Sequence, residues 1–341
     1  MDRNKAAVLG AGTWGIALAR MLANAGKEVT VWSALEDEVI NLQNTNRHPK
    51  LPGVEFPETI HYTADIKKAC SKKEIIVFAV PSVYVRSTAR TAAPHITESQ
   101  IVVDVAKGIE ADTLMTMTEI IADELKNPAI PLVALSGPTH AEEVSRDLPT
   151  TIVAASKDEE AAVTVQNFFS TSFMRVYTNS DVKGVEICGA IKNIMALAAG
   201  ISTGLGYGDN AKAAIITRGL AELSRIGMKI GCDFQTFSGL AGMGDMIVTC
   251  TSEHSRNNRC GYLIGTGLKP DEAVKEVGMV VEGINALPAA MRMAKECGED
   301  APIIRAVNSV VFENADPHEA VRTLFGRELK SEKAFITGEG S

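Results

Sequence analysis

The sequence of 341 residues lacks several features that would place it in a specialised class of protein. It has no long run of basic residues and a net charge of -8, so we do not expect a nucleic-acid partner. Its six cysteines are scattered without a Cys-x-x-Cys pair or zinc-like spacing, which predicts reduced thiols and no metal site. The N-terminal stretch MDRNKAAVLGAG has no signal-peptide core, and no uninterrupted apolar run reaches the about 18 residues that span a bilayer. We therefore expect a soluble cytoplasmic protein without membrane insertion.

What is present is the composition of an ordinary globular chain, long enough for two domains. Its first half alternates short apolar runs with helical stretches, such as a helix that ends at Gly26. The runs that we expect to form strands are Ala6–Leu9, Glu28–Trp32, Glu74–Val80, Ile101–Ala106, Pro131–Ser136 and Thr150–Ser156. Because they are continuously apolar rather than alternating, they predict a mostly parallel sheet covered on both faces, in a doubly wound α/β domain.

The pattern changes near Arg175–Asp181, after which long stretches rich in Ala, Leu and Met predict helices. Three prolines between Asn44 and Thr59 indicate a long loop within the first half. We place the domain boundary near residue 180. The expected organisation is an α/β domain over 1–180, an all-α domain over 181–335 and a frayed tail over 336–341.

Three glycines, Gly10, Gly12 and Gly15, stand in the spacing of a dinucleotide-binding turn. They follow the first expected strand and open the first helix, which is the context that the motif requires. Gly10 permits the tight turn, Gly12 lets a pyrophosphate approach the backbone, and Gly15 allows close packing of helix and strand. The helix N-terminus adds free N–H groups for the phosphates. The alternative is an ordinary glycine turn.

The segment after the second strand bears on the choice between NAD and NADP. An acid there holds the 2′-hydroxyl of NAD, whereas an arginine suits the 2′-phosphate of NADP. Here Ser33, Ala34 and Leu35 follow the strand, with Glu36 and Asp37 slightly later and no arginine adjacent. We expect Ser33 to lie at the cofactor, and either NAD or NADP remains compatible.

The second half contains an unexpected ammonium group, Lys192, within the apolar helical segment Gly189–Gly200. Small residues on the same helical face leave a groove, in which a cation faces either solvent or a ligand. Periodicity alone favours an ordinary surface lysine. Asp245 follows the glycine-rich stretch Gly239–Gly244 and could cap a helix or hold a lysine ammonium in place.

A second group of polar residues, Ser255–Arg259, is compatible with a phosphate site. Ser255 is a natural N-cap, and Arg256 and Arg259 then fall near the positive end of the helix. A bound anion would offset their repulsion by the helix dipole, although a solvated helix start is the alternative.

Two further candidates follow strands of the first half, where α/β sheets bind ligands. Thr139 has capping-box spacing to Glu142, so it can be a cap or a ligand contact. Lys107 also follows a strand and can point at a substrate oxygen or at water.

Together these segments resemble the NAD(P)-dependent glycerol-3-phosphate dehydrogenases, and the soluble prokaryotic type in particular. The matching motifs run in order over residues 8 to about 326: GAGTWG, AKGIE, SGPTHAEEV, GAIKNIMALAAG, NAKAAIITRGLAE, GLAGMGDMIVTCTSEHSRN and VVEG. The resemblance implies an N-terminal Rossmann domain and a helical C-terminal domain of the 6-phosphogluconate-dehydrogenase-like type. It implies hydride exchange between NAD(P)H and C2 of dihydroxyacetone phosphate or sn-glycerol 3-phosphate, in the service of phospholipid synthesis.

The resemblance also implies residue roles. Lys192 would be the general acid/base at the C2 oxygen, Asp245 would orient it, and Lys107 would touch substrate and cofactor. The further substrate residues implied are Gly137, Thr139, Ser255, Arg256 and Asn257. The further cofactor residues implied are Gly10, Gly12, Thr13, Trp14, Gly15, Ala141, Arg256, Val280 and Glu282. The residue after the second strand departs from the NADP-using members, which often carry a basic group there, whereas this chain has Ser33.

Two other functions are considered. A related two-domain 3-hydroxy-acid dehydrogenase would share the architecture, but the segments SRNNR and GLAGMGD match the phosphate-substrate family instead. A non-catalytic nucleotide-binding regulator would be expected to lack a proton donor, whereas Lys107, Lys192 and Asp245 are all present. The partner expected is a small phosphorylated substrate, and a homodimer is compatible because it is the commonest homo-oligomer.

Overall fold

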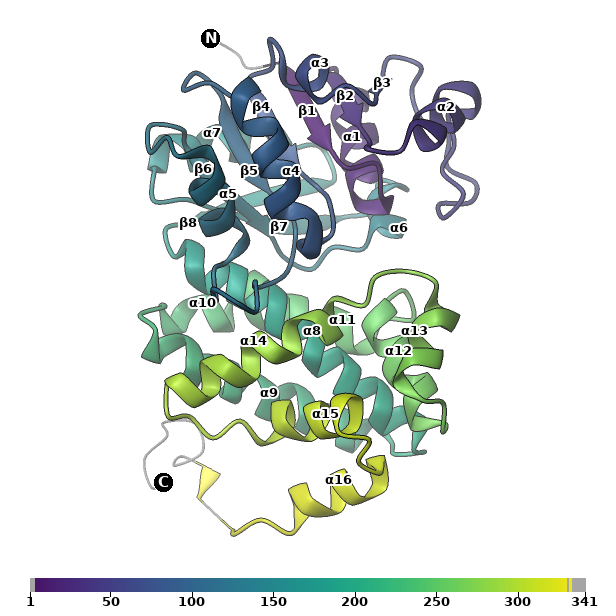
Figure 1. Ribbon diagram of the computed structural model, residues 1–341, viewed down its shortest axis with the longest axis vertical. Helices are drawn as coiled ribbons and strands as arrows, with labels where there is room; N and C mark the ends of the chain where they lie inside the picture. The colour runs from purple at the N-terminus through teal and green to yellow at the C-terminus, as the bar shows by residue number, and fades with distance from the viewer. Residues whose placement is uncertain (1–3, 330, 333–341) are drawn as a thin grey trace. The chain divides into compact units, whose positions relative to one another are not determined.

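The computed structural model describes residues 4–329, 331 and 332 (Figure 1). The tail expected over 336–341 lies outside the described residues. The chain divides into two compact units. The first runs up to Lys107 and resumes over Met115–Val182, and the second contains Gly108–Leu114 and the chain from Lys183 onward. Seven residues within the range 1–180 thus belong to the second unit.

The first unit is built on an eight-stranded sheet in the order β3-β2-β1-β4-β5-β6-β7-β8. All neighbours are parallel except β6 and β7, which confirms the predicted mostly parallel, doubly wound sheet. The strands are β1 Lys5–Leu9, β2 Glu28–Trp32, β3 His61–Thr63, β4 Ile75–Phe78, β5 Ile101–Asp104, β6 Leu132–Ser136, β7 Thr150–Ala155 and β8 Met174–Asn179. The strand order reverses between β1 and β4, and this switch point is where such sheets bind ligands at their carboxyl ends.

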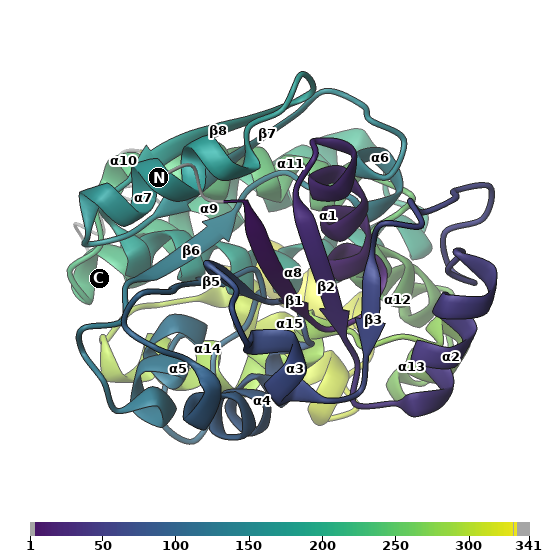
Figure 2. The same ribbon diagram turned by 90° about the horizontal axis from the view of Figure 1, so that it is seen from above.

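Helices cover both faces of this sheet (Figure 2). One face packs against α1 Thr13–Asn24, α6 Ala141–Val144 and α7 Glu159–Phe169. The other packs against α3 Ile66–Cys70, α4 Val85–Ala92 and α5 Met117–Leu125. The continuously apolar strands are explained by this double burial.

The edges of the sheet contain two strands that the hydrophobic pattern does not predict. β3 has three residues, and β8, at the far edge, alternates between buried and exposed side chains over its first four residues only. The helix expected to stop at Gly26 ends at Asn24, and Gly26 has the positive φ of +80° expected of such a stop. The expected loop begins at Asn46, because α2, Glu36–Thr45, includes the first two residues of its predicted range.

The second unit consists of helices, as predicted. They are α8 Val182–Gly204, α9 Asp209–Lys229, α10 Phe234–Ser238, α11 Asp245–Thr251, α12 Arg256–Gly265, α13 Pro270–Val277, α14 Glu282–Glu296, α15 Pro302–Phe312 and α16 Pro317–Phe325. A single π-helical turn, Leu240–Gly244, leads directly into α11. α8 is long and apolar enough to cross a membrane by length and composition, but its most apolar stretch is entirely buried inside the protein.

Glycines bring α8 and α12 into backbone contact. A Cβ added at Gly200 would lie 2.0 Å from the carbonyl oxygen of Asn258, and one added at Gly261 would lie 2.2 Å from that of Leu197. Neither position tolerates a side chain without separating the helices. The small residues of α8 therefore serve helix packing, and they fix the start of α12 against the helix that carries Lys192.

Candidate active site

The glycine turn between β1 and α1 is shaped by the protein's own backbone at two of its three glycines. Gly10 has a φ of +126°, and a Cβ there would lie 2.6 Å from the carbonyl oxygen of Ala79, just after β4. A Cβ at Gly15 would lie 2.1 Å from the carbonyl oxygen of Gly10. A side chain at either position would displace the backbone, which accounts for glycine at both. The turn lies between the ends of β1 and β4, at the switch point of the sheet.

Gly12 is different, because nothing lies within 4 Å of the position that its Cβ would occupy. Its φ of -65° is also accessible to any residue. Gly12 is the N-cap of α1, and because it has no side chain it does not cap the N–H groups of the first turn. Thr13 and Trp14 follow it in that turn. The absent side chain leaves open space directly over a helix N-terminus, which favours an anion such as a pyrophosphate. This observation supports a dinucleotide site over an ordinary glycine turn.

Ser33 lies at the end of β2, beside this turn in the sheet order, and is 5% exposed. Its hydroxyl donates a hydrogen bond to the Glu38 carboxylate in the first turn of α2 and accepts one from the Leu35 N–H at 3.2 Å. Burial lowers the pKa of His48, and the backbone of Ala11 in the glycine turn acts on that pKa in the opposite direction. Glu38 and His48 were not predicted from the sequence, because only the three-dimensional fold brings them to the turn.

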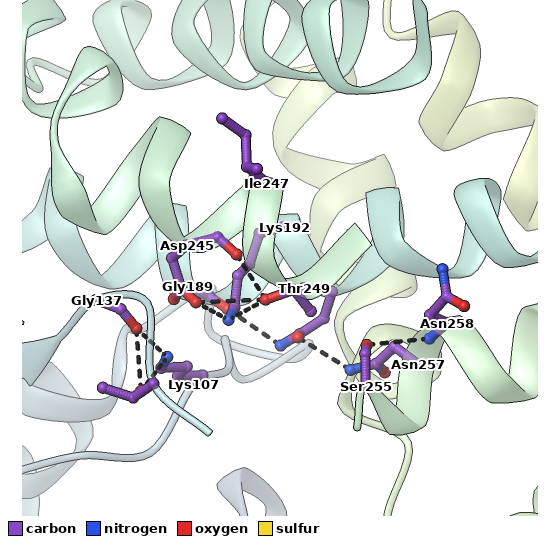
Figure 3. A network of polar contacts seen from close by, with 12 residues as sticks. Lys107, Gly137, Gly189, Lys192, Asp245, Ile247, Thr249, Ser255, Asn257 and Asn258 are labelled. Carbon is purple, nitrogen blue, oxygen red and sulfur yellow. Dashed lines mark hydrogen bonds and ion pairs between the residues drawn. The ribbon is translucent and has the colours of Figure 1, made fainter. Parts of the chain in front are cut away.

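The loops after β5 and β6 place Lys107 and Gly137 side by side (Figure 3), and Thr139 is hydrogen-bonded to both. The Lys107 ammonium donates to the carbonyl oxygen of Gly137 at 3.0 Å and to the Thr139 hydroxyl at 3.3 Å. Because β5 and β6 are parallel neighbours, their carboxyl ends meet at one edge of the sheet.

The capping interpretation of Thr139 is wrong. The N-cap of α6 is His140, the helix begins at Ala141, and the Thr139 hydroxyl donates to the Gly137 carbonyl at 3.0 Å instead. The helix therefore begins one residue later than the spacing of Thr139 and Glu142 predicts.

In the second unit, Lys192 is buried, with 4% of its surface exposed, so the surface-lysine interpretation is also wrong. Its ammonium forms an ion pair with the Asp245 carboxylate and donates to the Thr249 hydroxyl at 2.7 Å (Figure 3). That hydroxyl in turn donates to the Asp245 carbonyl at 2.6 Å, so its lone pairs are available to the ammonium. We call Lys192, Asp245 and Thr249 the lysine cluster.

The backbone just before α11 explains how Asp245 reaches the lysine. Asp245 is fully buried and is the first residue of α11, where it makes no cap of its own helix. The preceding π-turn is packed closely, since a Cβ at Gly242 would lie 2.1 Å from the Phe237 carbonyl oxygen. π-turns recur at functional sites because they redirect side chains that a regular helix would place elsewhere. Of the two alternatives for Asp245, the structure shows the one in which it holds the lysine.

Asparagine side chains link the lysine helix to the start of α12 and α14. The Asn257 amide nitrogen donates to the Asn193 side-chain oxygen at 3.0 Å. The Asn257 side-chain oxygen accepts from the Gly283 N–H at 2.8 Å. Asn193 itself donates to the Gly189 carbonyl at 3.1 Å. These buried contacts fix three helices at the level of Lys192, and sequence reasoning missed the roles of Asn193 and Thr249.

The N-terminus of α12 has the predicted cap. The Ser255 hydroxyl accepts from the Asn258 N–H at 3.2 Å, and Arg256 follows with an exposed side chain. The helix therefore presents backbone N–H groups and a guanidinium at one end, a combination suited to a phosphate.

The remaining expected cofactor residues lie at helix starts. Ala141 is the first residue of α6 and Glu282 the first of α14, with Val280 two residues before it. Among the residues that the structure describes, no group of three or more His, Cys, Asp or Glu side chains could hold a metal ion.

Both units are similar in sequence to known proteins. Residues 5–162 match the sequence model of the NAD-dependent glycerol-3-phosphate dehydrogenase N-terminus, and residues 181–322 match that of its C-terminus. Glycerol-3-phosphate dehydrogenase [NAD(P)+] 2 of Lactobacillus delbrueckii subsp. bulgaricus is 60% identical over 96% of this chain and 98% of its own length. The corresponding enzyme of Agathobacter rectalis is 48% identical over 98% of this chain and 99% of its own length.

Solved structures show the same similarity. The crystal structure of glycerol-3-phosphate dehydrogenase from Coxiella burnetii superposes with a TM-score of 0.92 at 35% identity, covering 96% of this chain and 100% of that one. On these matches, the chain belongs to the NAD-dependent glycerol-3-phosphate dehydrogenase family.

Proposed function

We propose that this chain is an NAD(P)-dependent oxidoreductase that interconverts dihydroxyacetone phosphate and sn-glycerol 3-phosphate, the precursor of phospholipid backbones. The observation that carries the proposal is the buried lysine cluster in a unit whose sequence matches the C-terminal family model. The names of the relatives support the substrate and the use of NAD(P)+.

The first unit holds the cofactor, which supplies or accepts the hydride when bound. Gly10, Gly12, Thr13, Trp14 and Gly15 form the turn that receives its pyrophosphate, where α1 offers backbone N–H groups. The open space over Gly12 is the feature of this structure that fits the group. Ser33 lies at the adenosine end, because it follows the strand next to the turn. The other residues that we assign to the cofactor are Lys107, Ala141, Arg256, Val280 and Glu282.

Lys192 exchanges the proton with the C2 oxygen of the substrate. Reduction of a ketone leaves negative charge on that oxygen, and an ammonium supplies both the proton and a compensating charge. Asp245 and Thr249 accept from the ammonium and thereby fix where its N–H groups point. Burial strengthens this electrostatic effect, because little water is present to screen it.

The substrate phosphate binds at the start of α12. Ser255, Arg256 and Asn257 are assigned to it, since the helix N-terminus and the exposed guanidinium both favour a dianion. Holding the phosphate fixes the distance to C2 and so positions the carbon for reaction. Lys107, Gly137 and Thr139 are assigned to the other end of the substrate, together with Lys192 and Asp245.

We further propose domain limits of 1–180 and 181–335, a cytoplasmic location and a homodimer. The burial of α8 inside the second unit supports a chain without membrane insertion.

Oxidation of NADH and of NADPH with dihydroxyacetone phosphate tests the activity, for the native chain and for Lys192→Met and Lys192→Arg. We expect turnover by the native chain and a loss of about 10²-fold or more in Lys192→Met with unchanged cofactor affinity. The Arg variant keeps the charge but cannot release its proton, so it should be equally inactive. Nucleotide binding without turnover in the native chain would contradict the proposal.

A further inference from the structure

We propose that Glu38 is a specificity-determining residue that makes this chain prefer NAD to NADP, with Ser33 positioning it. The Glu38 carboxylate would accept a hydrogen bond from the 2′-hydroxyl of the adenosine ribose and repel a 2′-phosphate. The inference rests on the cofactor site proposed above and extends it to a choice between two nucleotides.

Backbone and side-chain contacts hold Glu38 at the end of β2. The Ser33 N–H donates to the Thr63 carbonyl at 3.2 Å, which extends the β2–β3 pairing by one residue and fixes Ser33. The Ser33 hydroxyl then donates to one Glu38 carboxylate oxygen. Its acceptance of the Leu35 N–H orients the hydroxyl so that its proton points toward the carboxylate. Glu38 is half-buried, and this hydrogen bond holds its side chain in one conformation, whereas an exposed glutamate without such a bond samples several.

Glu38 also lies near the glycine turn, although α2 is a separate element. The Gly10 N–H donates to the Trp32 carbonyl at 2.9 Å, and Ser33, the residue after Trp32, holds the Glu38 carboxylate. The end of β2, the start of α2 and the turn after β1 therefore converge on one region. In dinucleotide-binding folds an acid in this region, about 20 residues after the glycines, accepts the ribose 2′-hydroxyl. Glu36 and Asp37 are nearer in sequence, but both are exposed.

The acidic side chains around Glu38 disfavour the 2′-phosphate of NADP. Glu36, Asp37 and Glu38 are all in the first turn of α2. A 2′-phosphate carries a charge of about -2 at neutral pH, and like charges at close range lower affinity. Two cations lie on the following loop. Arg47 is paired with Glu55 at the surface, and the charge of Lys50 acts at His48.

Direct binding of NADH and NADPH, measured by nucleotide fluorescence without substrate, tests the inference. We expect the native chain to bind NADH at least about tenfold more tightly than NADPH. Glu38→Gln should bring the two dissociation constants to within about threefold, by weakening NADH and strengthening NADPH. Ser33→Ala should shift the ratio in the same direction by a smaller factor, since the carboxylate remains but is no longer held.

Glu36→Gln is the matched control, because it removes the same charge from the same helical turn at an exposed position. Its ratio of dissociation constants should stay close to native. An equal shift in Glu36→Gln and Glu38→Gln would overturn the inference, because net charge alone would then explain the preference. Equal or tighter binding of NADPH by the native chain would also overturn it while leaving the proposed activity intact. Binding of neither nucleotide would overturn both.

Discussion

Removal of Asp245 should destabilise the second unit strongly, and removal of its partner should restore much of the loss. Lys192 is 4% exposed and Asp245 is 0% exposed, so Asp245→Ala removes the carboxylate that compensates the charge of an ammonium in the interior. Breaking a buried pair from one side costs about 3–5 kcal/mol. Replacing both charges with apolar groups removes the uncompensated charge and is often close to neutral.

A double-mutant cycle over Asp245→Ala, Lys192→Met and the combined variant measures this coupling. The free energy lost by the combined variant should be smaller than the sum of the single losses by about 2 kcal/mol or more. Urea unfolding should be followed by far-ultraviolet circular dichroism, because the second unit is helical. Tryptophan fluorescence is unsuitable, since Trp14 and Trp32 both belong to the first unit. If the losses of the two single variants add up in the combined variant, or if Asp245→Ala leaves the free energy of unfolding unchanged, Lys192 and Asp245 do not stabilise each other as a buried ion pair.

Three further predictions concern separate parts of the chain. Gly12→Ala should change the free energy of unfolding by less than about 1 kcal/mol yet weaken NADH binding about tenfold or more. Gly15→Ala should lower the free energy of unfolding by about 1–3 kcal/mol, because its Cβ meets the backbone. Calorimetry and nucleotide titration separate the two variants, and equal effects of both substitutions on stability and on binding would contradict this distinction. Arg256→Ala should raise the KM for dihydroxyacetone phosphate about 10–100-fold without altering the melting temperature, and an unchanged KM would remove this residue from the phosphate site. Burial raises the pKa of Glu222 to about 7 although its carboxyl accepts two backbone N–H groups of α15. Because the folded state binds this proton more tightly than the unfolded state, the stabilisation from Glu222 is full below pH 4.5 and is lost as the pH rises through about 7. The free energy of unfolding of the native chain, relative to that of Glu222→Gln, should fall by up to about 3 kcal/mol over that window. A difference between the two chains that does not change with pH would contradict this prediction.

The central strands were predictable from the sequence because they are buried on both faces. Each of the six expected runs corresponds to a strand, within two residues at either end. The edge strands were not predictable, since β3 has only three residues and β8 has exposed Arg175, Tyr177 and Thr178. At the edge of a sheet, pairing with a neighbour decides the conformation more than hydrophobicity does.

The sequence identified the chemical groups of the second unit but not their arrangement. Local rules favour a cap for Asp245 and solvent for Lys192, because they consider only residues within a few positions. The partner of Lys192 is 53 residues away in the chain and reaches it after a π-turn that no residue pattern predicts. Resemblance to a family brought these residues together before the structure did, while Thr249 and Glu38 required the structure.

Transfer of deuterium is the most direct test of the central claim that this chain moves a hydride to C2 of dihydroxyacetone phosphate. The chain should be incubated with dihydroxyacetone phosphate and NADH deuterated at the transferable C4 position, and the product examined by proton NMR and mass spectrometry. We expect one deuterium per glycerol 3-phosphate, located at C2, and almost no product from Lys192→Met. Absence of product from the native chain, or deuterium at another carbon, would contradict it.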